Sequence, residues 1–250
     1  MEKSFTIIIP ARLASTRLPE KLLRKIGGKT IIERSYLAAK DSGADRVIIA
    51  TDDKKIFATA KQFGAEVVMT RSDHESGTDR LAECALALDL PDDDIIVNLQ
   101  GDEPFMPAHF IDLCADTLAN DSAAAVATLA SRIHDTADID NPNVVKVVVN
   151  RNGHALYFSR AGIPFNRDNQ ALNLAEHYFH HLGIYAYRAS FLKRYSQLPP
   201  SEIEHIEKLE QLRVLDNGEK IAVALVDEKP PKGIDSAEDL AAAIAFFNRQ

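Results

Sequence analysis

The stretch FTIIIPARLASTRLPEK, residues 5–21, carries the first evidence of the fold. Residues 5–11 form a continuous run rich in β-branched side chains, which is typical of a strand buried on both faces of a sheet. Residues 12–21 contain small residues and three cations, Arg12, Arg17 and Lys21. A buried strand that leads into such a loop predicts phosphate binding at the carboxyl end of a parallel sheet. The alternative is a solvated loop with ordinary surface cations.

Strand-like and helix-like segments alternate along the first half of the chain. After the strand at 5–11, further strands are predicted at 46–52, 66–70 and 94–100. Helical patterns lie between and after them, at 30–43, 54–64, 77–90 and 107–121. Strict interleaving of this kind predicts an α/β fold, with a mostly parallel central sheet and helices on both faces.

The pattern changes after about residue 124. Strands are predicted at 124–130, 144–150, 154–160, 182–188 and 221–226, with Asn152-Gly153 as a hairpin signal. Helices are predicted at 190–198, 201–215 and 236–250, the second opened by the capping box Ser201–Glu204. We expect a single domain, residues 1–250, with a smaller mixed or antiparallel insertion near 130–190.

The composition limits the partners. The 250 residues include 29 Lys and Arg against 37 Asp and Glu, a net charge of −8, which argues against nucleic acid or an anionic membrane as partner. No apolar run approaches the ~18 residues of a membrane helix, and no signal peptide is evident. Cys84 and Cys114 lie in apolar helical patterns, as buried thiols of a cytoplasmic protein do. Residues 1–25 nevertheless carry a local charge of +4, which indicates a small anionic ligand.

Two carboxylates are candidates for a metal site. Asp102 follows the strand at 94–100 in the segment QGDEP, where it could ligate Mg²⁺ held by a substrate phosphate. Asp235 is the best candidate for a second ligand. For each residue, capping of the following helix is the alternative. Cations beside a metal carboxylate are what nucleotidyl transfer requires.

Other motifs are less specific. The segment SGTDR, residues 76–80, could receive a base or a ribose at a helix start, or could be a plain helix cap. No G-x-G-x-x-G follows the first strand, and Gly28-Lys29-Thr30 lacks the earlier glycine of a P-loop. The histidines His177, His180 and His181 lack the cysteine or carboxylate partners of a zinc site.

Several segments together resemble those of the 3-deoxy-manno-octulosonate cytidylyltransferases, and they span essentially the whole chain. In order, they are IIIPARLASTRLPEKLL, HESGTDR, VNLQGDEP, ALYFSRAGIP, HHLGIYAYR, EKLEQLRVL and GIDSAEDL. The resemblance implies a Rossmann-like nucleotidyltransferase fold and a homodimer. It also implies Mg²⁺-dependent transfer of CMP from CTP to the acidic eight-carbon sugar 3-deoxy-D-manno-octulosonate (Kdo), with release of pyrophosphate, for lipopolysaccharide biosynthesis.

The resemblance further implies a role for each matching residue. Ala11, Arg12, Arg17 and Lys21 would bind the nucleotide, the three cations at its triphosphate, and Lys21 would stabilise charge at the α-phosphate. Ser76, Gly77, Arg80 and Gln100 would line the cytidine pocket, and Asp102 and Asp235 would hold the Mg²⁺. The sugar acid would contact Arg160, His181, Tyr185, Glu210 and Gln211, with Arg160 opposite its carboxylate.

One departure from the family pattern lies inside the basic loop. The family usually has glycine where this chain has Glu20. An outward Glu20 leaves the site intact, whereas an inward one would weaken triphosphate binding. Transfer to sialate or to the 8-amino analogue of Kdo is an alternative activity, and a non-catalytic nucleotide-sugar sensor is an alternative of another class.

Overall fold

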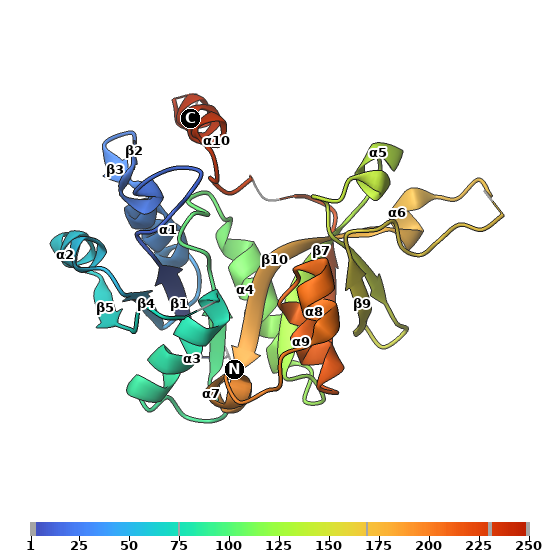
Figure 1. Ribbon diagram of the computed structural model, residues 1–250, viewed down its shortest axis with the longest axis horizontal. Coiled ribbons are helices and arrows are strands. Elements are labelled where there is room, and N and C mark those ends of the chain that lie inside the picture. Colours follow the sequence, from blue (N-terminus) through green and yellow to red (C-terminus); the bar gives the residue numbers. More distant parts are fainter. Residues whose placement is uncertain (1–3, 75, 169, 230–231, 249–250) are drawn as a thin grey trace.

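A nine-stranded sheet forms the centre of the molecule in the computed structural model, which describes residues 4–74, 76–168, 170–229 and 232–248 (Figure 1). Seven strands follow the order β11-β7-β10-β6-β1-β4-β5. In chain order they are β1 (Phe5–Ala11), β4 (Arg46–Thr51), β5 (Glu66–Met69), β6 (Ile95–Asn98), β7 (Val126–Arg132), β10 (Phe179–Arg188) and β11 (Ile221–Val226). The remaining two, β8 (Lys146–Val149) and β9 (Ala155–Ser159), form a hairpin beside β10.

The sheet is mostly parallel, as predicted. β1 pairs in parallel with β4 and β6, and β7 pairs in parallel with β11. Among the described strands of this row, β10 alone runs in the opposite direction, between β6 and β7. The chain therefore moves outward from β1 to β5 and returns to the other side of β1 as β6, and ligands bind at such a reversal of strand order.

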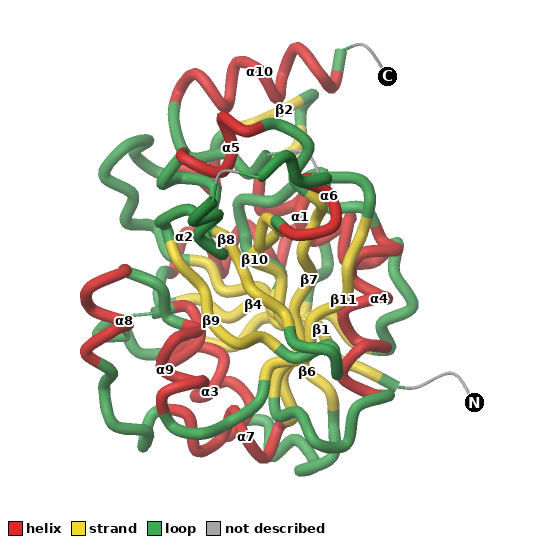
Figure 2. Tube along the Cα trace, turned by 90° about the vertical axis from the view of Figure 1, so that its right-hand side faces the viewer, coloured by secondary structure: helices red, strands yellow, loops and turns green. Residues whose placement is uncertain are grey.

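Helices cover both faces of the sheet, in agreement with the prediction. One face packs against α1 (Ile31–Lys40), α2 (Lys54–Gln62) and α4 (Ala108–Ala119). The other packs against α3 (Gly77–Ala87), α7 (Ala189–Tyr195) and α9 (Gln211–Asp216). Figure 2 shows the strands between α4 on one side and α3, α8 and α9 on the other. Because side chains alternate along a strand, Ile7 and Ile9 enter the first core layer and Ile8 the second.

The hairpin segment projects from the main sheet. It contains β8 and β9 and the short helices α5 (Thr136–Asp140) and α6 (Leu174–His177), and it extends away from α2 and β5 (Figure 1). The predicted turn lies between β8 and β9, where Gly153 has a left-handed φ of 78°. None of the helices in the described part of the chain is long and apolar enough to span a membrane.

The C-terminal helix α10 (Ala237–Phe247) crosses to the side of the small hairpin β2 (Lys25–Ile26) and β3 (Lys29–Thr30), above the main sheet (Figure 1). The guanidinium of Arg34 lies 3.8 Å from the centre of the Phe247 ring, and Phe246 packs edge-on against Phe105 at 5.2 Å. These contacts hold the C-terminal end of α10 against the main body, while the hydrogen bond from the Ile234 N–H to the Asp102 carbonyl holds the segment before the helix, which carries Asp235.

One predicted helix is wrong. Residues 201–215 form two helices, α8 (Glu202–Glu207) and α9, separated by Lys208 at a left-handed φ of 55°. The capping box Ser201–Glu204 is present, so the prediction fails only at the break. The guanidinium of Arg160 donates to the carbonyls of Glu207 and Lys208, which gives these groups partners outside a continuous helix.

Candidate active site

Two neighbouring cavities lie at the carboxyl ends of β1 and β6. The larger, of about 410 Å³, is called the main cavity here and lies between β1, α3, β10 and α9. The smaller, of about 290 Å³, is called the loop cavity and lies inside the basic loop, residues 12–21. Pro10, Arg12 and Gln100 line both, so a single extended ligand can occupy them together.

Lys21 lines the loop cavity and is the first residue of the short 3₁₀ helix Lys21–Leu23. Its Nζ donates to Asp102 Oδ2 at 2.5 Å and to Asp235 Oδ1 at 3.0 Å. Burial alone would lower the pKa of Lys21, but the charges of the two aspartates and their hydrogen bonds raise it. Lys21 is therefore a fixed cation between two carboxylates.

Neither Asp102 nor Asp235 caps the helix that follows it, so the capping alternative is wrong for both. Ser236 and Asp239 cap helix α10, which leaves the side chain of Asp235 to Lys21 and to Arg17, 3.2 Å away. Pro107, without a side-chain cap, precedes α4, so Asp102 does not cap it. The Ile234 N–H donates to the Asp102 carbonyl at 2.9 Å, which ties the two segments together.

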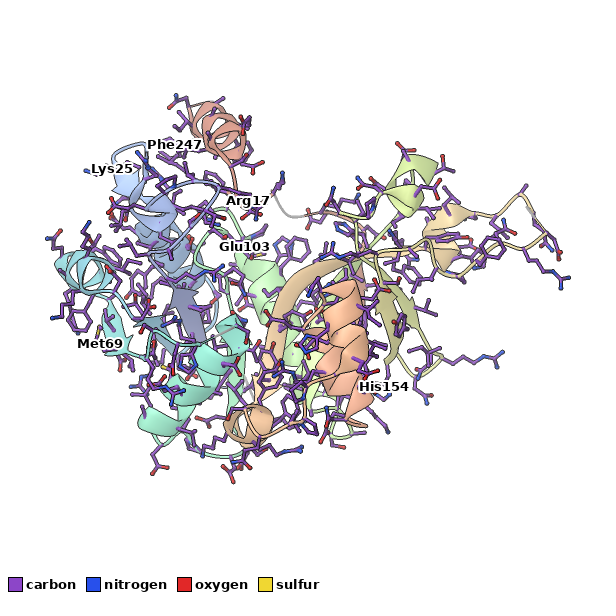
Figure 3. The ribbon with its side chains drawn as sticks, in the orientation of Figure 1. Arg17, Lys25, Met69, Glu103, His154 and Phe247 are labelled. Carbon is purple, nitrogen blue, oxygen red and sulfur yellow. The ribbon has the colours of Figure 1, made fainter. Side chains whose placement is uncertain are left out.

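A third carboxyl group, Glu103, lies close enough to Asp102 and Asp235 to feel their charges, and Figure 3 labels it near Arg17 of the basic loop. Its Oε2 is buried and has no hydrogen-bond partner among the described residues. Burial, together with the charges of Asp102 and Asp235, raises the pKa of Glu103 to about 8. We did not predict a role for Glu103 from the sequence, although it lies in the QGDEP segment.

The basic loop presents its cations to the cavities and turns its acid outward. Arg12 is exposed and lines both cavities, and Arg17 lines the loop cavity. Glu20 has a left-handed φ of 52° and pairs with Lys55 of α2 at 2.5 Å. The side chain of Glu20 does not line the loop cavity, which corresponds to the outward alternative.

The residues predicted for the nucleotide surround one side of the main cavity. Ser76 caps α3 by accepting from the Asp79 N–H, and Gly77 and Gln100 also line the cavity. Arg80 is almost fully buried and bonds to Thr70 Oγ1 and Asp52 Oδ2, at 2.5 Å and 3.3 Å. Ala11 completes this side at the end of β1.

The predicted sugar residues divide into two groups. His181, Tyr185, Glu210 and Gln211 line the main cavity. Gln211 Nε2 is a buried donor that has no partner within the described part of the chain, so it is available to an acceptor on a ligand. Burial raises the pKa of Glu210, whose carboxyl accepts from Thr78 Oγ1 at 3.3 Å.

Arg160 lies outside the lining of both cavities. Its guanidinium donates to the carbonyls of Pro142, Glu207 and Lys208, at 3.0, 2.7 and 3.4 Å. In this structure Arg160 therefore supports the break between α8 and α9, which turns Glu210 and Gln211 toward the cavity.

The main cavity also contains polar groups that we did not predict from the sequence. They are His74, Thr78, Asn98, Tyr187, Tyr195 and Lys208. His74 bonds to the carboxylate of Glu83, whose position on α3 could not be related to His74 without the fold. Thr78 and His74 lie in the segment HESGTDR, residues 74–80, so the resemblance to the family could have indicated both residues.

The histidine cluster is separated in the fold. His180 and His181 are consecutive on β10 and therefore point to opposite faces of the sheet. Within residues 4–74, 76–168, 170–229 and 232–248, no three His, Cys, Asp or Glu side chains converge on a metal-binding position.

Comparison with known proteins identifies the family. Residues 6–221 match the family described as cytidylyltransferase. A 3-deoxy-manno-octulosonate cytidylyltransferase of Haemophilus influenzae is 52% identical, over 95% of this chain and 96% of its own length. The chain belongs to this family.

Two further relatives agree with the assignment. A 3-deoxy-manno-octulosonate cytidylyltransferase of Francisella tularensis is 51% identical over 97% of this chain and 98% of its own. A solved structure of CMP:2-keto-3-deoxy-manno-octonic acid synthetase complexed with CTP is 41% identical, covers 99% of both chains and has a TM-score of 0.91. The fold described above is therefore that of a nucleotidyltransferase.

Proposed function

We propose that the protein transfers CMP from CTP to Kdo and releases pyrophosphate, which supplies CMP-Kdo for lipopolysaccharide biosynthesis. The observation that carries the proposal is that Pro10, Arg12 and Gln100 line both cavities, so that one ligand can reach from one cavity into the other. The loop cavity holds cations and carboxylates that suit a triphosphate. The main cavity combines charged side chains, among them Arg12 and Arg80, with amide, hydroxyl and imidazole groups that suit a base and a sugar acid. The names of the relatives support the same donor and acceptor.

In this proposal the chain acts by positioning and by electrostatic stabilisation. Arg12 and Arg17 hold the leaving pyrophosphate, and Lys21 leaves the carboxylate pair to stabilise charge at the α-phosphate. Ser76, Gly77, Arg80 and Gln100 hold the cytidine. His181, Tyr185, Glu210 and Gln211 orient the anomeric hydroxyl of the sugar toward the α-phosphorus, in line with the leaving group. Arg160 lines neither cavity. In this proposal it binds the carboxylate of the sugar only if its side chain moves toward the main cavity when the sugar binds.

Asp102 and Asp235 fit Mg²⁺ by their chemistry. Their oxygens meet at one point, the Lys21 ammonium, and Mg²⁺ in phosphoryl-transfer sites takes one or two carboxylates together with substrate phosphates and water. We propose that these aspartates hold it. When bound, the ion would offset phosphate charge and lower the pKa of the attacking hydroxyl.

We further propose that the protein acts as a cytoplasmic homodimer that pairs through the projecting hairpin segment. Phe165 and Leu156 on this segment are 84% and 59% exposed, and a partner copy seated on the segment would remove their apolar surface from water. The two buried free thiols, Cys84 and Cys114, support a reducing compartment. Analytical ultracentrifugation tests the dimer, and Phe165→Ser is expected to weaken it.

The deciding experiment measures pyrophosphate release with CTP and Mg²⁺ and with one of three sugars. Kdo should be the best substrate, and its 8-amino analogue and sialate test the alternative acceptors. Asp102→Asn should lower turnover by about 10²–10³. Asp92→Asn is the matched control, since Asp92 is exposed on a turn before β6 and pairs with Lys193. Turnover by Asp102→Asn within a few-fold of the parent would contradict the proposal, and CTP binding without turnover of any sugar would favour the sensor.

A further inference from the structure

The hydroxyl of Thr128 on β7 lies within hydrogen-bond distance of the His181 imidazole. Thr128 is fully buried, and its Oγ1 lies 2.6 Å from the Ile184 carbonyl and 3.1 Å from His181 Nε2. A hydroxyl has one proton, and the carbonyl can only accept, so the Thr128 proton goes to Ile184. The contact with His181 is then a hydrogen bond only if His181 Nε2 carries a proton and donates it to Thr128.

The backbone of β10 makes this arrangement specific. The pairing of β10 with β7 shifts register between His181 and Tyr185, and Gly183 within the shift has a left-handed φ of 75°. Such a bulge re-aims side chains and removes backbone groups from the ladder. The Ile184 carbonyl, which the bulge releases from the ladder, accepts a hydrogen bond from the Thr128 hydroxyl instead.

Aromatic rings hold the imidazole on its other sides. Phe158 packs edge-on against it at 4.9 Å between ring centres, and Tyr185 lies at 5.3 Å. With Nε2 bonded to Thr128, Nδ1 is the ring nitrogen that remains for a ligand in the main cavity. The ring cannot reverse without breaking the chain from His181 through Thr128 to Ile184.

We propose that Thr128 is a positioning residue that holds His181 as the Nε2-protonated tautomer, so that Nδ1 accepts a hydrogen bond from a hydroxyl group of the sugar acid. The inference rests on the proposed function for the identity of the ligand. Burial, with the neighbouring His180, lowers the pKa of His181 to about 3, so the ring is neutral near pH 7. In this tautomer Nδ1 carries no proton and can only accept, so it cannot form a hydrogen bond with a carboxylate, which is also an acceptor.

The same cavity offers a donor for that carboxylate. Gln211 Nε2 is buried, lacks a partner among the described residues and lines the main cavity with His181. An acceptor on β10 and a donor on α9 distinguish the hydroxyl and carboxylate ends of a sugar acid. Together they set which way the sugar faces the nucleotide.

The first test reads the tautomer in the parent protein without substrate. Imidazole ¹⁵N chemical shifts separate protonated from unprotonated ring nitrogens, and the His181 signals are assigned by their loss in His181→Gln. We expect a proton on Nε2 and none on Nδ1. A proton on Nδ1 would overturn the proposal whatever reaction the protein catalyses, so this result does not depend on the proposed function.

The second test compares variants of β7. Thr128→Val should give a mixture of tautomers and raise KM for Kdo roughly tenfold, the loss expected for one hydrogen bond, with KM for CTP little changed. Thr128→Ser keeps the hydroxyl and should restore both readouts. Ser131→Ala is the control, since Ser131 is buried on the opposite face of β7 and its hydroxyl has no partner within the described residues.

The two readouts separate the parts of the proposal. An unchanged KM for Kdo in Thr128→Val would refute the role of the threonine in sugar binding, even if the tautomer changes. A parent enzyme that does not use Kdo would refute the proposed function, while the ¹⁵N spectrum would still decide the tautomer. Loss of sugar affinity in Ser131→Ala would show a general effect of β7 and would also overturn the proposal.

Discussion

Replacing Lys21 by Met should move metal binding and turnover in opposite directions. Lys21 occupies the position between the two carboxylates at which we propose a divalent cation, at 2.5 Å from Asp102 and 3.0 Å from Asp235. The Met side chain keeps an apolar stem of similar length and removes the charge. The variant therefore leaves two neighbouring carboxylates with fewer cationic partners.

The size of the effect follows from these two hydrogen bonds. A hydrogen bond to a charged group contributes about 1.5–3 kcal/mol, but the Asp235 side chain is 42% exposed, so its share is reduced by solvent screening. We therefore take about 1.4 kcal/mol as the smallest free energy by which Lys21 opposes metal binding, and this corresponds to a tenfold change in the affinity for the metal. Nucleotide-free Lys21→Met should bind Mn²⁺, used in place of Mg²⁺, at least about tenfold more tightly than the parent.

Turnover of the same variant should fall by about 10²–10³, because Met cannot stabilise charge at the α-phosphate. Calorimetric titration with Mn²⁺ gives the first quantity and pyrophosphate release gives the second. Lys29→Met is the control, since Lys29 is 48% exposed, pairs with Glu33 and lines neither cavity. Equal or weaker Mn²⁺ binding by Lys21→Met would refute the view that Lys21 and the metal compete for the carboxylates.

The remaining predictions concern the basic loop, the sugar site and pH. Glu20→Gly should be about 1 kcal/mol more stable than Glu20→Ala in urea unfolding, because both lose the Lys55 pair but only Ala keeps the left-handed strain. Equal stabilities would contradict this. Gln211→Leu should raise KM for Kdo about tenfold and leave KM for CTP unchanged; the reverse pattern would place Gln211 at the nucleotide. Burial first, and the charge of Lys229 second, lower the pKa of His180 to about 4. Between pH ~6.5 and pH 4 the unfolded chain therefore binds a proton at His180 that the folded chain does not bind. The free energy of unfolding keeps its full His180 contribution above pH ~6.5 and falls toward pH 4, by up to about 1.4 kcal/mol per pH unit. His180→Gln should flatten this part of the urea-unfolding profile, and an unchanged slope would argue against it.

The features that the sequence predicted correctly are local ones. The β-branched run at 5–11 forms β1, and the capping box at Ser201 is present as predicted. The exits of β1 and β6 carry the cations and Asp102, because parallel neighbours end at the same edge of a sheet. The helix predicted at 30–43 forms α1, and the Thr30 side chain caps it by accepting from the Glu33 N–H.

The break at Lys208 could not be predicted from the local pattern. Residues 201–215 have a good helical period, and the groups that interrupt it come from Arg160, far away in the chain. At such positions tertiary hydrogen bonds outweigh the helix propensity of the local sequence. The same limit applies to the role of Arg160, which the family pattern places at the sugar and this structure places at the break.

The sequence by itself determined the order of strands and helices, the basic loop and the acidic residues of the site, because periodicity, capping and charge are properties of neighbouring residues. The tertiary structure alone decided which side chains meet. It brought Asp235 to Lys21 across more than 200 residues, placed Thr128 against His181 through a bulge, and turned Glu20 outward to Lys55. These contacts depend on the packing of distant elements, which no local pattern of residues encodes.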